Sequence, residues 1–192
     1  AIAARIAPAG LGTDTGGSTR VPAALCGIAG LRPSVGNGGA QRRYTNTNAV
    51  VPISPTRDTV GPMARSVADI ALLDSVVTGR AIATGIGLRG LRIGTPASFW
   101  AGLEGAVAAV MAAARDKLAA AGVVFVDVDT TGLTALNNLV SFQIALHEPI
   151  ADIPAYLAAT GVAGVTVADI AAQVASPDVQ GAFGAILADA FG

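Results

Sequence analysis

A glycine-rich stretch near the start of the chain carries the residue types that could do chemistry. It reads Gly-Thr-Asp-Thr-Gly-Gly-Ser-Thr-Arg-Val-Pro over residues 12–22. Gly16 and Gly17 have no Cβ, so the backbone there can adopt positive φ and turn its N–H groups toward a ligand. Ser18 follows them directly and is a candidate nucleophile, because an attacked carbonyl oxygen would lie among those amides. One such donor is typically worth about 100- to 1,000-fold in rate.

The same stretch also leaves open a second interpretation, a phosphate- or nucleotide-binding glycine loop. Gly12 and Gly17, followed by Ser18 and Thr19, have the spacing of a P-loop, except that serine stands where the phosphate-binding lysine belongs. That lysine supplies the charge that meets the β- and γ-phosphates, and neither Thr19 nor Arg20 stands in its place. The residues therefore favour a nucleophile over a nucleotide-binding module.

Two sequence blocks together carry a resemblance to a known family. The first block is GTDTGGSTRVPAALCGIAGLRP over residues 12–33, and the second is PISPTRDTVGPMARSVAD over residues 52–69. In this order they resemble the amidase signature family, the hydrolases with a Ser–cis-Ser–Lys triad. The second block is similar to enzymes that act on arylacetamides, such as mandelamide and indoleacetamide hydrolases.

The resemblance implies a role for each residue of the glycine turn. Ser18 would be the acyl-accepting nucleophile, and the backbone amides of Thr15, Gly16, Gly17 and Ser18 would form the oxyanion hole. The reaction would release ammonia from a small carboxamide through a seryl acyl-enzyme. The resemblance to arylacetamide hydrolases would make that carboxamide an aryl one. No metal or organic cofactor is implied.

Three neighbours of the turn are expected to shape it. Asp14 and Arg20 match family positions that organise the loop rather than do chemistry. Asp14 could serve as an acid or base, but a carboxylate bonded to loop amides or to Arg20 would be structural. Thr19 departs from the family pattern, in which an aliphatic residue usually follows the nucleophile. This departure slightly weakens the argument that the loop packs as it does in the family, and it leaves the nucleophile untouched.

The general base that the resemblance requires has no counterpart in the sequence. The family's lysine and middle serine lie well upstream of the nucleophile, and the chain begins only shortly before Ser18. Lys117, the sole lysine, lies far downstream and does not match by position. A serine hydroxyl without a base is a poor nucleophile at neutral pH. We therefore expect a middle portion of an amidase, incomplete at both ends and inactive alone; a catalytically inert scaffold fragment is the alternative.

Composition and charge exclude several classes of partner. Among the 192 residues, 52% are hydrophobic and 13% charged, and the net charge is −1. The basic residues are scattered apart from Arg42 and Arg43, interpreted as a solvated loop pair, so nucleic acid is not expected as a partner. No apolar run reaches the roughly 18 residues that span a bilayer, so no membrane insertion is expected. One cysteine fits a reducing, cytoplasmic location. A small-molecule amide is the expected partner. The resemblance also implies that the protein could form a homodimer.

Other reactive side chains have simpler interpretations. Cys26 has no histidine nearby and is expected to be a buried small hydrophobe. His147 and Glu148 begin like a zinc-binding helix motif, but the second histidine is missing and Pro149 follows, so a capping or surface histidine is expected. Tyr44 lies in a loop rich in Gly, Asn and Arg, where contact with substrate is conceivable and an exposed tyrosine is the simpler expectation.

The elements that must position these residues follow from hydrophobic periodicity and from Gly and Pro breaks. Ser66 should cap a helix that runs to about Val77 with a core stripe of Val67, Ile70, Ala71 and Val77, and Gly79 should end it. The other expected elements are the end of a helix at 1–6, a short buried strand at 10–13, a helical or irregular run at 22–28, a surface loop at 34–50, turns throughout 52–62, strands at 91–94 and 123–128, and a helix at 102–121.

The strand, helix, strand succession over residues 91–128 is the βαβ unit of a parallel sheet. From residue 131 the pattern is helical, with breaks at Pro and Gly residues. We therefore predict an α/β fold with a mixed, largely parallel sheet covered by helices, the amidase signature fold. Residues 1–192 would form a partial amidase domain, with an α/β core portion at 1–130 and a helical portion at 131–192.

Overall fold

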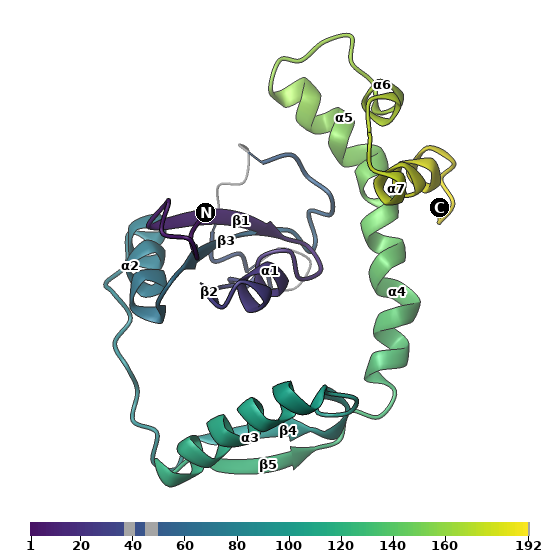
Figure 1. Cartoon of the computed structure of the whole chain (residues 1–192). Helices are drawn as coiled ribbons and strands as arrows, with labels where there is room; N and C mark the ends of the chain where they lie inside the picture. The colour runs from purple at the N-terminus through teal and green to yellow at the C-terminus, as the bar shows by residue number, and fades with distance from the viewer. Residues whose placement is uncertain (37–40, 45–49, 192) are drawn as a thin grey trace. The chain divides into compact units, whose positions relative to one another are not determined.

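The computed structural model describes residues 1–36, 41–44 and 50–191, which fall into two compact units (Figure 1). Unit 1 comprises Ala1–Ala83 and Ser141–Gly192, and unit 2 comprises Thr84–Val140. The mixed α/β prediction is confirmed, because both units combine strands and helices. Most of the predicted loop at 34–50 lies outside the described residues. The proposed division at residue 130 stays a prediction.

Unit 1 contains a three-stranded antiparallel sheet with the order β1-β3-β2. Its strands are β1 (Ala9–Asp14), β2 (Ala29–Gly30) and β3 (Thr59–Ala64). In the register of β1 and β3, Ala9 pairs with Ala64 and Asp14 with Thr59, so the end of β1 lies beside the start of β3. The prediction of a largely parallel sheet is wrong for these strands. It extrapolated from residues 91–128, whereas β1 and β2 both run against β3.

The helix α2 (Val67–Thr78) begins and ends as predicted. The Ser66 side chain accepts a hydrogen bond from the Asp69 amide at 3.1 Å, and Gly79 ends the helix in the left-handed conformation at φ 66°. The predicted core stripe is only partly correct. Ile70 is buried, but Val67 and Val77 are exposed. The polar residue Asp74 is buried on this face instead, because its carboxylate accepts hydrogen bonds there.

The remaining helices of unit 1 flank the sheet connections or follow residue 131. Arg57 joins the two parts of the unit by donating a 2.6 Å hydrogen bond to Ser141 Oγ. The helices α5, α6 and α7 contact one another. The bounds are α1 (Arg20–Leu25), α4 (Leu133–His147, which begins in unit 2), α5 (Pro149–Ala159), α6 (Val167–Ala172) and α7 (Pro177–Leu187).

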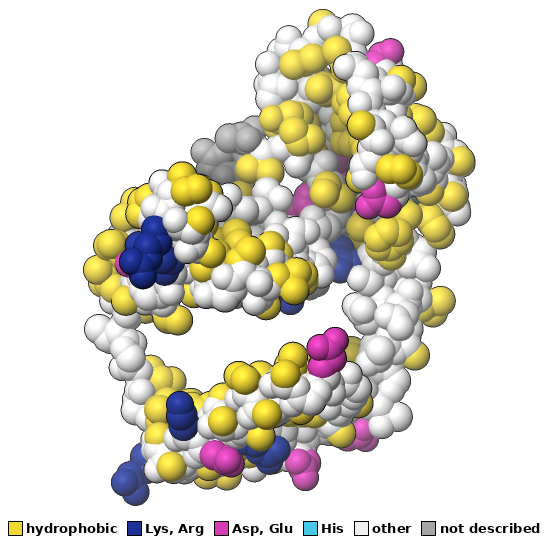
Figure 2. Space-filling view, in the orientation of Figure 1, with side chains coloured by type: hydrophobic (Ala, Val, Ile, Leu, Met, Phe, Trp, Pro, Cys, Tyr) yellow, Lys and Arg dark blue, Asp and Glu magenta, His cyan; other side chains and the backbone are white. Residues whose placement is uncertain are grey.

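Unit 2 is the predicted βαβ element. Its strands β4 (Arg92–Pro96) and β5 (Val124–Val128) pair in parallel, with a short 3-10 turn at Ala97–Phe99 and the helix α3 (Gly105–Ala120) between them. The Arg115 guanidinium of α3 lies over the Phe125 ring, 4.8 Å from its centroid. Figure 2 shows hydrophobic side chains exposed along α3, where Val110 is 69% exposed. The two strands therefore cover only part of the apolar surface of this helix.

Several local predictions are wrong. The strand β3 occupies Thr59–Ala64, which overlaps the turns expected at 52–62, and β1 is not the expected buried strand, because Leu11 is 62% exposed. Residues 1–6 form turns rather than the end of a helix, because Arg5 adopts a positive φ of 60°, which a continuing helix does not allow. Cys26 is exposed rather than buried, since α1 ends at this residue after only six positions. Among the described residues, no helix is long and apolar enough to cross a membrane.

Candidate active site

The glycine-rich stretch forms the connection from a strand to a helix. The strand β1 ends at Asp14, the chain bends over residues 15–17, and α1 begins at Arg20. Gly17 is buried and adopts φ +143°, a conformation that residues with a side chain rarely take, and a Cβ there would lie 3.1 Å from Val21 Cγ2. Ser18 follows in a turn and is exposed. The turn therefore presents the serine to solvent at the end of a strand.

Three amides of this turn are available to bind an anion. The N–H groups of Gly16, Gly17 and Ser18 donate to no acceptor among the described residues. The neighbouring groups are engaged, since the Thr19 amide donates to Asp14 Oδ2 at 3.3 Å and the Val21 amide to the Gly17 carbonyl at 2.8 Å. Successive unpaired amides in such a turn can bind an oxyanion. The oxyanion role of residues 15–18 stays a prediction.

Asp14 organises the turn from the end of β1. Its side chain is fully buried and accepts hydrogen bonds from Arg20 Nε at 3.0 Å, Arg20 Nη2 at 3.1 Å and Arg32 Nη1 at 2.9 Å. Burial raises the pKa of Asp14. The hydrogen bonds and charge of Arg20, the hydrogen bond from the Thr19 amide and the charge of Arg32 outweigh this effect and lower the pKa to about 2. The carboxylate is therefore ionised at neutral pH and paired, which suits an organising role rather than acid or base catalysis.

The second sequence block lies against the first. Arg32 Nη2 donates to the Arg57 carbonyl at 2.7 Å, and Thr15 Oγ1 donates to Asp58 Oδ1. The other oxygen of Asp58 accepts from the amides of Ile53 at 2.7 Å and Ser54 at 2.8 Å. Sequence reasoning recognised this block but gave Asp58 no role. Its position inside a recognised block was the one available signal.

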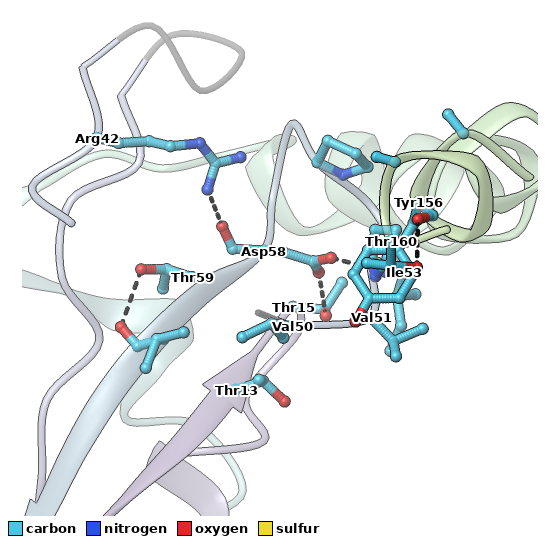
Figure 3. Close-up of a pocket in the computed structure, with 15 residues that line it drawn as sticks. Thr13, Thr15, Arg42, Val50, Val51, Ile53, Asp58, Thr59, Tyr156 and Thr160 are labelled. Atoms are coloured by element: carbon cyan, nitrogen blue, oxygen red, sulfur yellow. Dashed lines mark hydrogen bonds between the residues drawn. The ribbon is translucent and has the colours of Figure 1, made fainter. Parts of the chain in front are cut away.

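A cavity of about 380 Å³ lies beside the turn (Figure 3). Thr15 connects the two, because it belongs to the glycine-rich stretch and lines the cavity, whereas Ser18 is not a lining residue. Tyr156 of α5 and Thr160, which directly follows that helix, line one side of the cavity. The lining is Thr13, Thr15, Arg42, Val50, Val51, Pro52, Ile53, Pro55, Asp58, Thr59, Val60, Ala155, Tyr156, Ala159 and Thr160.

Comparison with known proteins decides the family. A family model described as amidase matches residues 1–179. The chain belongs to the amidase family. A mandelamide hydrolase of Pseudomonas putida is 42% identical over 183 residues, which are 95% of this chain and 34% of that protein. An indoleacetamide hydrolase of Agrobacterium vitis is 42% identical over 181 residues, which are 93% of this chain and 37% of that protein.

Solved amidase structures share the fold. The native peptide amidase of Stenotrophomonas maltophilia superimposes with a TM-score of 0.68 at 30% identity, over 89% of this chain and 37% of that one. This likeness confirms the predicted amidase signature fold. The chain spans about one third of the length of the relatives that it matches. The comparisons give no support to the phosphate-binding alternative.

Elsewhere in the amidase chain, the interpretation of the loop residues needs correction. Tyr44 is buried rather than exposed, and its hydroxyl donates to Asp74 Oδ1 at 3.0 Å. Burial and the neighbouring Asp74 raise the pKa of Tyr44 to about 12. Arg43 is not a solvated loop residue, because its Nε donates to the same carboxylate at 2.6 Å. These residues tie the loop to α2.

The remaining candidates are a histidine and a lysine. His147 is exposed, and its Nδ1 lies 3.3 Å from Asp189 Oδ1, in agreement with the surface histidine that was predicted. No group of His, Cys, Asp and Glu side chains within the described ranges could hold a metal ion. Lys117 lies on α3, in unit 2, whereas the glycine turn belongs to unit 1.

Proposed function

We propose that the native protein carrying this chain is an amide hydrolase that uses Ser18 as its nucleophile. Ser18 Oγ attacks the carbonyl carbon of a small carboxamide, the C–N bond breaks, and ammonia leaves with the proton that the serine hydroxyl gives up. Water then attacks the acyl-enzyme and releases the acid and the free serine. The observation that carries this proposal is an exposed serine that directly follows amides without an acceptor among the described residues.

The oxyanion of each tetrahedral intermediate is proposed to lie among the amides of residues 15–18. Such donors act most strongly when they are already aimed at the position where charge develops, because no reorganisation is then needed during the reaction. Gly17 supports the proposal because its φ of 143° is one that residues with a side chain rarely adopt, so the backbone of this turn depends on a glycine. The hydrogen bond from Arg20 to Asp14 also supports this proposal, because it connects the residues on either side of the turn.

The base is proposed to come from residues outside this chain. The resemblance places a neutral lysine and a cis-serine upstream of the nucleophile, and these would carry the proton from Ser18 to the leaving nitrogen. The 192-residue chain by itself is therefore expected to lack amidase activity. A cytoplasmic location, a homodimer and the absence of nucleic-acid partners remain predictions from the sequence.

The substrate is proposed to be a carboxamide with an apolar, aryl-sized acyl group. Two named relatives are a mandelamide hydrolase and an indoleacetamide hydrolase. The cavity beside Thr15 supports the same class, since about 380 Å³ lies within the range of small-molecule sites. Val51, Ile53, Val60 and Tyr156 give it apolar walls.

Kinetics of the native protein test this function. Wild type should release ammonia from mandelamide and indoleacetamide faster than from acetamide, and Ser18→Ala should abolish turnover of all three without changing the circular dichroism spectrum. Ser34→Ala is a matched control, because this serine is also exposed and lies outside the glycine-rich turn. Undiminished ammonia release by Ser18→Ala would refute the assignment.

A further inference from the structure

Asp58 lies outside the glycine-rich stretch, but its carboxylate contacts that stretch directly (Figure 3). Oδ1 accepts the hydroxyl of Thr15, and Oδ2 accepts the amides of Ile53 at 2.7 Å and Ser54 at 2.8 Å. The backbone N–H of Asp58 also donates to the Ser54 carbonyl at 2.6 Å. Because both oxygens have donors, the carboxylate cannot rotate without losing at least one hydrogen bond.

The backbone that holds Asp58 is itself anchored. Ser54 is fully buried, and its hydroxyl donates to the Glu148 carboxylate. Thr56 Oγ1 donates to Glu148 Oε1 at 2.6 Å. Glu148 directly precedes α5, so the turn at residues 53–58 is attached to that helix. Asp58 therefore offers Thr15 an acceptor whose position is set by surrounding structure.

The turn at residues 15–18 is held at its two ends and at the Gly17 carbonyl, which accepts the Val21 amide at 2.8 Å, whereas the amides of Gly16 and Gly17 donate to no acceptor among the described residues. Asp14 accepts the Thr19 amide at one end, and Asp58 accepts the Thr15 hydroxyl at the other. Gly16 and Gly17 have no side chains that could be held. The direction of their amides therefore depends on the two anchored ends.

We propose that Asp58 is a positioning residue that aims the oxyanion-binding amides through its hydrogen bond to the Thr15 side chain. This inference rests on the proposed function of Ser18. Asp58 does not touch the reacting atoms in this scheme. It fixes the side chain of Thr15, and thereby the plane of the peptide groups that follow. A donor that points away from the developing charge stabilises the transition state less, while binding of the uncharged substrate changes little.

Substitutions at Thr15 test this role without placing a new charge or a cavity in the protein. Thr15→Val keeps the shape of the side chain and removes the hydroxyl. In the native protein it should lower kcat by about 10- to 100-fold and change KM by less than about twofold, because misplacement by about 1 Å costs up to about 100-fold. Thr15→Ser restores the hydroxyl and should recover most of the lost kcat. Thr134→Val is the matched control, at an exposed helical position.

Backbone order parameters from NMR relaxation give a second readout that does not require activity. The order parameters of Gly16 and Gly17 should be lower in Thr15→Val than in wild type or Thr15→Ser, because one end of the turn is released. Unchanged kcat in Thr15→Val, an equal loss in Thr15→Ser, or unchanged order parameters would each overturn the inference while Ser18→Ala is still inactive. Full activity of Ser18→Ala would overturn the proposed function, and this inference with it.

Discussion

Thr19, the residue after the proposed nucleophile, buries a hydroxyl that has no hydrogen-bond partner among the described residues. Its side chain is fully buried, and Cβ atoms built at two neighbouring glycines would lie close to it. The built Gly12 Cβ would be 3.1 Å from Thr19 Oγ1, and the built Gly61 Cβ 3.3 Å from Thr19 Cγ2. The methyl group packs well here, whereas the hydroxyl has lost its water without gaining an acceptor. Thr19→Val should therefore stabilise the protein.

The magnitude follows from the desolvation of one hydroxyl. Leaving a buried polar group unsatisfied costs about 1–3 kcal/mol, and an apolar group of the same shape avoids that cost. A methyl group is slightly larger than a hydroxyl, and the glycines leave little room, so we expect a net gain of about 1 kcal/mol. Thr19→Ser keeps the hydroxyl and removes the methyl group. It should lose about 1 kcal/mol of stability instead.

The free energy of unfolding of the native protein and both variants, measured by urea denaturation, checks this reasoning. A gain of about 1 kcal/mol also raises Tm, so thermal unfolding gives a second measurement; the shift should be smaller than the roughly 2–4 °C of a domain of 150–250 residues if the native protein is as long as its relatives. The family resemblance points in the same direction, because an aliphatic residue usually occupies this position. A Thr19→Val variant less stable than wild type would show that the hydroxyl has a partner, and would refute the reasoning.

Two further predictions concern stability. The folded-state pKa of Asp14 is lowered from 3.8 to about 2, so its ionised form stabilises the fold by about 2 kcal/mol above pH 4. The stability advantage of wild type over Asp14→Asn should therefore shrink between pH 4 and 2 in urea titrations, and a constant difference would contradict the pairing. Gly61→Ala should cost about 3 kcal/mol, because its Cβ would lie 2.1 Å from the Leu31 carbonyl oxygen. Gly85→Ala, with no atom within 4 Å of its Cβ, should change stability by less than about 0.5 kcal/mol, and equal effects would refute this packing.

Local signals in the sequence predicted the elements that depend on neighbouring residues. The helix after Ser66 begins at a serine cap and ends at Gly79, and both signals act within one helical turn. The strand, helix, strand pattern of unit 2 is also local, because β-branched runs and a glycine break are enough to define it. The exposed turn at Ser18 follows from two adjacent glycines in the same way.

Features that depend on distant partners were not predictable from these patterns. Tyr44 looked like an exposed loop residue because Asp74, 30 positions away, gives no local sign that it will accept the hydroxyl. The contact of Thr15 with Asp58 spans 43 positions. The antiparallel pairing of β1 with β3 joins strands separated by a long connection, and periodicity does not indicate strand direction. Long-range pairing is a property of the folded chain, which a single sequence shows only through family resemblance.

The most direct test of the account is the identity of the residue that carries the acyl group during turnover. The native protein would be mixed with excess mandelamide, quenched in acid before the substrate is consumed, and digested for mass spectrometry. We expect the peptide containing Ser18 to gain the mass of the acid minus one water, and fragmentation to place this mass on Ser18. Ammonia release with the acyl group on another side chain, or with an unmodified Ser18 under conditions where the acyl-enzyme accumulates, would contradict it.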